Sequence, residues 1–112
     1  HLSRTRLLLH LVDILPPEGN PAEQVVKIIH ELEKYDPELA RKERWLVLNK
    51  LDLLLPEEQA AHCQMILDEL QWQGKVFQVS AVTGEGCREL CYAVMHRFEE
   101  LAEIAAMSPP EV

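Results

Sequence analysis

The chain has 112 residues, 47% of them hydrophobic, and a formal net charge of −8 at pH 7. This length allows one small domain, and the negative charge disfavours nonspecific binding to nucleic acid or anionic membranes, because both would repel the chain. The longest nearly continuous apolar run, residues 7–12, is far shorter than the roughly 20 residues that cross a bilayer. We therefore expect no membrane partner and no direct nucleic-acid binding. Three cysteines form no even disulfide framework, which favours the cytoplasm.

Apolar periodicity predicts three strands that alternate with three helices. The strands are expected at about residues 6–14, 44–49 and 76–79, and the helices at about residues 21–35, 56–72 and 86–104. The first two strands are apolar on both sides, as is typical of parallel strands that are covered on both faces. This order predicts an α/β fold with a parallel sheet.

Helix starts and ends are also encoded. Asn20 and Pro21 read as an N-cap followed by a first-turn proline, and Pro56 opens the next helix, with two glutamates beside the positive end of its dipole. The last helix carries an apolar stripe that we expect to be buried, namely Leu90, Cys91, Val94, Phe98, Leu101 and Ala102. Because two prolines follow Ser108, residues 105–112 are predicted to form a loose tail.

The second predicted strand ends in Asn49-Lys50-Leu51-Asp52. Ligands of open parallel sheets bind beyond the carboxyl ends of the strands, so this polar segment should face the binding crevice. The carboxylate of Asp52 can accept hydrogen bonds from N1–H and the amino group of guanine, a donor pair that adenine lacks. Asn49 can bridge the neighbouring loop and reach the base, and the stem of Lys50 can lie on the purine face with its charge in solvent.

A second polar loop follows the third predicted strand, about thirty residues later. Ser80, Ala81 and Val82 are its candidate site residues. A backbone N–H around Ala81 can meet guanine O6, where adenine would present an amino group, and the Ser80 hydroxyl can help to hold the loop. Two such loops in this order predict a site for GTP or GDP.

With these motifs the chain resembles the distal half of the GTPase domain of the Obg family. The matching stretches are residues 6–13, 31–40, 44–52 and 79–86, and residues 1–104 would be the C-terminal portion of that domain. The resemblance implies a three-layer, P-loop NTPase-like half-domain. It also implies a bacterial protein that hydrolyses GTP with Mg²⁺, binds the large ribosomal subunit during its assembly, and acts in growth and stress control.

The parts of a GTPase that hold the phosphates are missing from these residues. A phosphate loop needs the pattern G-x-x-x-x-G-K-[S/T], and glycines at 19, 74, 84 and 86 cannot supply it. No aspartate is followed by glycine three residues later. We therefore interpret the chain as an excised half-domain without catalytic residues and without Mg²⁺ ligands of its own, and expect it to show no GTPase activity.

Other interpretations remain open. Asp13, at the end of the first strand, could be the phosphoacceptor of a receiver-like or flavodoxin-like signalling module, but a loop-capping role is favoured. A circularly permuted GTPase would also place the same two motifs ahead of its phosphate loop. The histidines show no zinc-ligand spacing, so no metal site is predicted. Right-handed crossovers should place the first two helices on one face of the sheet, which leaves the other face partly open and favours self-association.

Overall fold

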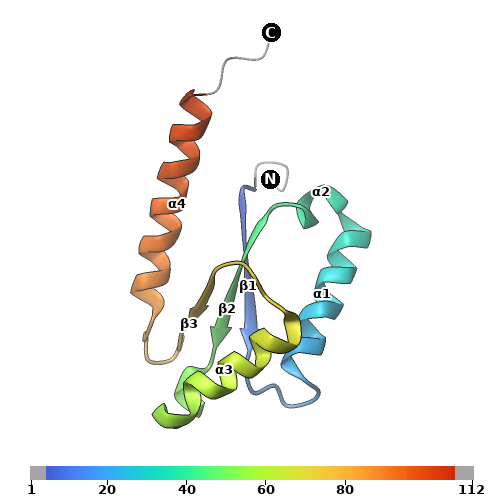
Figure 1. Ribbon diagram of the computed structural model, residues 1–112, viewed down its shortest axis with the longest axis vertical. Coiled ribbons are helices and arrows are strands. Elements are labelled where there is room, and N and C mark those ends of the chain that lie inside the picture. Colours follow the sequence, from blue (N-terminus) through green and yellow to red (C-terminus); the bar gives the residue numbers. More distant parts are fainter. Residues whose placement is uncertain (1–4, 108–112) are drawn as a thin grey trace.

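The computed structural model describes residues 5–107 and contains one sheet of three parallel strands in the order β1-β2-β3 (Figure 1). The strands are β1 (Leu7–Asp13), β2 (Glu43–Asn49) and β3 (Val76–Gln78). Asp13 lies beside Asn49 in the register of β1 and β2, and Leu48 lies beside Gln78 in that of β2 and β3. The predicted α/β fold and its parallel sheet are confirmed, with strand ends within one residue of the expected positions.

Four α-helices accompany the sheet within residues 5–107. They are α1 (Pro21–Tyr35), α2 (Pro37–Ala40), α3 (Pro56–Leu70) and α4 (Cys87–Met107), and a 3-10 turn, η2 (Leu51–Leu53), follows β2. The prediction of three helices is therefore incomplete, because it missed α2. That helix forms because the Asp36 side chain accepts a hydrogen bond from the backbone N–H of Leu39 at 3.1 Å, which starts a new helical turn directly after α1 ends.

The predicted helix starts agree with the structure. The Asn20 side-chain oxygen accepts from the backbone N–H of Ala22 at 2.8 Å and that of Glu23 at 3.4 Å, so two of the unpaired N–H groups of the first turn are satisfied. At α3 the Glu58 carboxylate accepts from the Leu55 N–H at 3.4 Å.

Within residues 5–107, no helix combines the length and the apolar composition that a membrane crossing requires.

The core lies on one face of the sheet, beneath α1 and α3. Its buried members come from β1, β2, α1 and α3 and the loops beside them, and they are Val12, Ile14, Val25, Leu46, Leu48, Leu51, Cys63 and Ile66. Since α1 follows β1 and α3 follows β2 along the chain, both crossovers bring their helices to the same face, as the handedness of parallel connections predicts.

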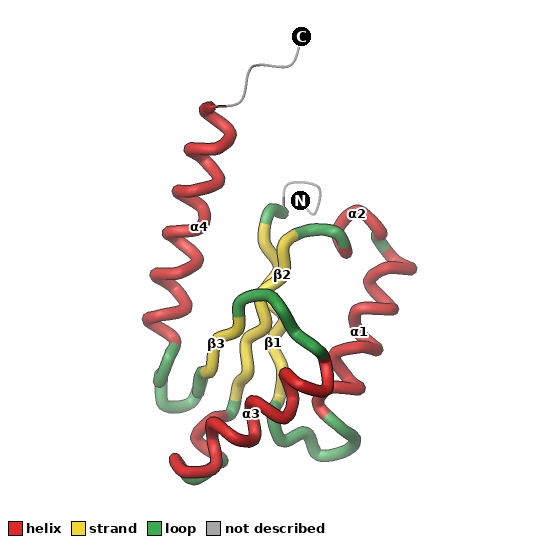
Figure 2. The backbone as a smooth tube through the Cα atoms, in the orientation of Figure 1, coloured by secondary structure: helices red, strands yellow, loops and turns green. Residues whose placement is uncertain are grey.

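The opposite face is covered only in part by α4. Figure 2 shows this helix running beside the sheet and projecting past it. Arg97 on α4 contacts Glu43 at the start of β2, with Nη2 and Oε1 2.8 Å apart, and Trp45 and Val47 on this face are buried. Their register partners on β1, Leu9 and Leu11, are 41% and 66% exposed. The expectation of an open sheet face is confirmed.

The predicted burial of the α4 stripe is wrong. No residue of α4 is buried, and Cys91, Phe98 and Ala102 are exposed. A three-stranded sheet is too narrow and too short to cover a helix of 21 residues, because such a helix is about 30 Å long. The helix also continues to Met107, past the predicted end at residue 104, since Ala105 and Ala106 favour helix. The rest of the predicted tail, residues 108–112, lies outside the described part of the chain.

Candidate functional site

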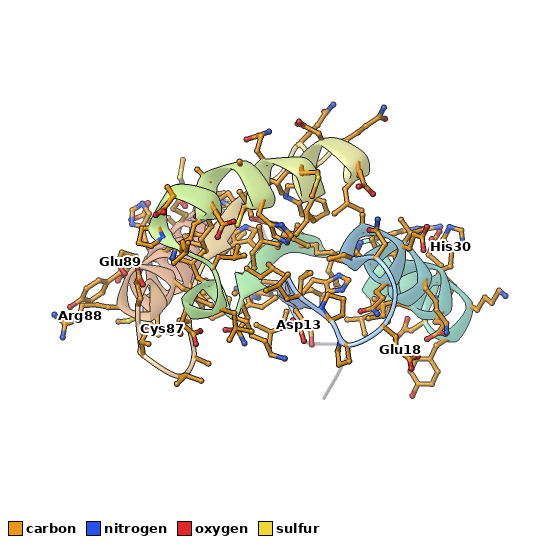
Figure 3. The ribbon with its side chains drawn as sticks, turned by 90° about the horizontal axis from the view of Figure 1, so that it is seen from below. Asp13, Glu18, His30, Cys87, Arg88 and Glu89 are labelled. Atoms are coloured by element: carbon orange, nitrogen blue, oxygen red, sulfur yellow. The ribbon has the colours of Figure 1, made fainter. Side chains whose placement is uncertain are left out.

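Two loops meet at the carboxyl edge of the sheet, which Figure 3 views from below. The first begins at Asn49, the last residue of β2, and continues through Lys50 and η2. The second runs from Val79 to Gly86 and connects β3 to α4. Because neighbouring parallel strands end at the same edge, residues about thirty positions apart in sequence come into direct contact here.

Asn49 joins the two loops. Its side-chain Oδ1 accepts a hydrogen bond from the backbone N–H of Ala81 at 3.0 Å. Two residues after Asn49, the backbone N–H of Leu51 donates to the Val79 carbonyl at 3.2 Å. The predicted bridging role of Asn49 is therefore present in the geometry.

Asp52 and Ser80 form the second link. The Ser80 hydroxyl donates to Asp52 Oδ1 at 2.6 Å and accepts from the Thr83 N–H at 3.2 Å. Ser80 is fully buried, so these partners satisfy a hydroxyl that would otherwise be costly to bury. Asp52 itself is exposed, and within residues 5–107 no hydrogen bond engages its second oxygen, Oδ2. The carboxylate is thus held at one oxygen and open to a ligand at the other.

Two glycines shape the second loop. Its backbone closes through a bond from the Ser80 N–H to the Glu85 carbonyl at 2.9 Å and one from the Gly84 N–H to the Ser80 carbonyl at 2.8 Å. Gly84 and Gly86 have φ of +84° and +77°, and a Cβ at Gly86 would lie 2.2 Å from the Gln78 carbonyl oxygen. Any side chain at position 86 would push the loop away from the end of β3.

Lys50 is fixed in a way that was not expected. Its φ is +75°, a left-handed conformation that costs a residue with a Cβ roughly 1–2 kcal/mol. The ammonium Nζ lies 2.5 Å from Asp13 Oδ2 at the end of β1, and the Lys50 side chain is 44% exposed. This carboxylate was not foreseen from the sequence as a partner of the lysine charge.

Asp13 does cap the following loop, as predicted, because its Oδ1 accepts from the Leu15 N–H at 2.9 Å. The second partner, Lys50, was missed. Burial raises the pKa of Asp13, but the hydrogen bond from Lys50, the bond from Leu15 and the lysine charge outweigh it, so the pKa lies below its ordinary value. A strand-end aspartate beside a strand-end lysine could have suggested the pair, had the register of the two strands been known.

The backbone N–H groups of Ala81 and Val82 differ in whether they are free to bond to a ligand. The Ala81 N–H is bonded to Asn49, so it meets a ligand only by sharing or exchanging that bond. The next N–H, of Val82, has no hydrogen-bond partner in the described part of the chain, and Val82 as a whole residue is 85% exposed. Val82 therefore offers the more accessible donor for an acceptor such as a carbonyl oxygen.

All the predicted site residues lie together at the carboxyl end of the sheet: Asn49, Lys50, Asp52, Ser80, Ala81 and Val82. The site presents a carboxylate oxygen, a backbone N–H and a lysine stem. Among residues 5–107, no three His, Cys, Asp or Glu side chains come close enough to hold a metal ion. No protein-family model matches the chain.

Proposed function

We propose that this chain recognises the guanine base of GTP or GDP and forms the base-binding half of an Obg-type, P-loop NTPase-like GTPase. The observation that carries this proposal is the double link between the two loops, Asn49 to Ala81 and Asp52 to Ser80. These links join the two segments on which the sequence resemblance depends. Parallel-strand topology brings the two loops close together, but it does not require that the side chains of Asn49 and Asp52 both bond to the second loop.

In this proposal each group has a chemical task. The two oxygens of Asp52 accept from the N1–H and the amino group of guanine, while the Ser80 hydroxyl, bonded to a further lone pair of Oδ1, fixes the plane of the carboxylate. The Val82 N–H, or the Ala81 N–H released by Asn49, donates to guanine O6. Adenine presents a donor at that position and no donor pair to Asp52, so it would be rejected by unpaired groups at both places.

Hydrolysis belongs to parts outside these residues. Phosphoryl transfer is catalysed by positioning and charge stabilisation at the phosphates, and no phosphate loop can be written in this sequence. We propose that the Mg²⁺ ligands, the catalytic groups and the contacts with the large ribosomal subunit belong to the rest of a longer cytoplasmic protein. The 112 residues by themselves bind the base weakly and do not hydrolyse GTP.

The test is a nucleotide titration of the ¹⁵N-labelled chain followed by NMR, which detects weak binding. GMP should shift the amide signals of residues 49–52 and 80–83, and AMP should not. Asp52→Asn replaces an acceptor oxygen with a donor that faces the guanine amino group, so GMP binding should weaken about tenfold or more. Xanthosine monophosphate, with an oxygen at that position, should become the preferred ligand of the variant.

Glu57→Gln is the matched control, because it makes the same carboxylate-to-amide change at an exposed position on α3. It should leave the preference for GMP unchanged. If Asp52→Asn also leaves that preference unchanged, or if GMP and AMP shift the same signals in the wild type, residues 49–52 do not read the base and the proposal falls.

A further inference from the structure

Asp13 takes no part in reading the base, yet it occupies a defined position at the site. Asp13 is the last residue of β1 and lies beside Asn49 in the register of β1 and β2. Lys50, which directly follows Asn49, is therefore close enough to reach Asp13. The backbone of Lys50 is left-handed, and the ammonium reaches Asp13 Oδ2 at 2.5 Å. Figure 3 shows Asp13 at the viewed edge of the sheet.

The Asp13 carboxylate is itself anchored, since its other oxygen is bonded to the Leu15 N–H. The Asp13 side chain is 26% exposed. A backbone N–H therefore orients this acceptor in addition to the lysine. This distinguishes the pair from a typical ion pair of two freely rotating surface side chains, which contributes little because both side chains must first be ordered.

We propose that Asp13 is a positioning residue for base binding: it holds the Lys50 ammonium at the end of β1, so that the lysine stem is already in place as one wall of the base site. The inference rests on the proposed guanine function. A lysine side chain has large rotational freedom, and ordering it upon binding weakens affinity. Prior ordering by Asp13 removes that cost, which corresponds to roughly a two- to tenfold gain in affinity.

Asp13→Asn is the informative substitution, because the amide keeps an oxygen for the Leu15 N–H and removes the charge that holds Lys50. GMP affinity, measured by NMR titration, should fall roughly two- to tenfold. The dispersion of the amide signals should remain that of a folded chain. Glu18→Gln is the matched control: Glu18 is an exposed carboxylate at the same edge (Figure 3), and its loss should leave GMP affinity unchanged.

A double-mutant cycle separates positioning from a general structural role. Lys50→Met keeps an unbranched stem and removes the charge, so Asp13→Asn should have no further effect on GMP affinity in the Lys50→Met background. An equal loss in both backgrounds would show that Asp13 does not act through Lys50. The side-chain Nζ signal of Lys50 should also change in Asp13→Asn, and an unchanged signal would overturn the pairing without any reference to nucleotide.

A failure of the proposed function can be distinguished from a failure of this inference alone. If the wild type shows no guanine-specific shifts at residues 49–52 and 80–83, the proposed function fails and this inference with it. If GMP binds the wild type and Asp13→Asn with the same affinity, the inference alone fails. If Asp13→Asn does not fold, Asp13 has a structural role that this inference does not include, and the inference is overturned.

Discussion

The two faces of the sheet differ although the same strands form both. On the face beneath α1 and α3, Leu46, Leu48 and Val12 are almost completely buried. On the α4 face, burial is complete only along β2 and is lost at β1, where Leu11 is 66% exposed. Two crossover helices close one face by topology, whereas α4 on the other face is joined to the sheet by the ion pair of Arg97 with Glu43 at the start of β2. The stability of the chain should therefore depend on the α1 and α3 face.

The largest expected effect compares one leucine from each face. Leu48→Ala removes a side chain that is completely buried in the core, and should lower the free energy of unfolding by about 2–5 kcal/mol, or abolish the cooperative transition. Leu11→Ala, on the open face, should change it by no more than about 0.5 kcal/mol. Urea denaturation followed by circular dichroism measures both. Similar losses in the two variants would show that the open face is as well packed as the core.

A second prediction concerns contacts that the open face makes with other copies of the chain. β1 pairs only with β2 in the described part of the sheet, and Leu9 and Leu11 lie exposed beside its free edge. Such an edge favours association, so the sedimentation coefficient should rise with concentration. Leu11→Lys should weaken association about tenfold, since about 1.5 kcal/mol of leucine burial is lost.

Met65→Lys is the control for that experiment, because it places the same charge on an exposed apolar position of α3. It should leave association unchanged. A wild-type chain that sediments as a monomer at all concentrations would contradict the prediction.

The smallest expected effect concerns the ion pair that attaches α4 to the sheet. The hydrogen bond from Arg97 lowers the pKa of Glu43 below its ordinary value of 4.5, although burial opposes the shift. A carboxylate with a lowered pKa in the folded state stabilises the fold above pH 4.5, and this stabilisation disappears as pH falls through the folded-state pKa. Glu43→Gln should therefore lower the Tm at pH 7 by a few degrees, with the difference disappearing in acid.

Glu99→Gln, an exposed carboxylate-to-amide change on the same helix, should not alter the Tm at pH 7. A difference between Glu43→Gln and the wild type that persists well below pH 4.5 would mean that the substitution disturbs packing and not the ion pair.

Much of the site could be predicted because parallel strands all end at one edge. That rule alone brought Asn49 and Asp52 close to Ser80 and Ala81. The rule does not specify how each backbone turns after its strand. The left-handed Lys50 and its bond to Asp13 therefore escaped prediction.

Sequence alone determined the three strands and the three long helices of this protein and their order, because periodicity, caps and prolines act over a few residues. Val26 on α1 is 44% exposed, but Val25 on α1 and Cys63 and Ile66 on α3 were buried, since the crossover rule ensures that a sheet lies beneath these two helices. The equally apolar stripe of α4 was not, because burial requires a partner surface and sequence periodicity does not show how far that surface extends. Tertiary structure alone decided how much of the open face α4 covers, and which strand-end carboxylate holds the lysine, because both depend on register and distance between segments remote in sequence.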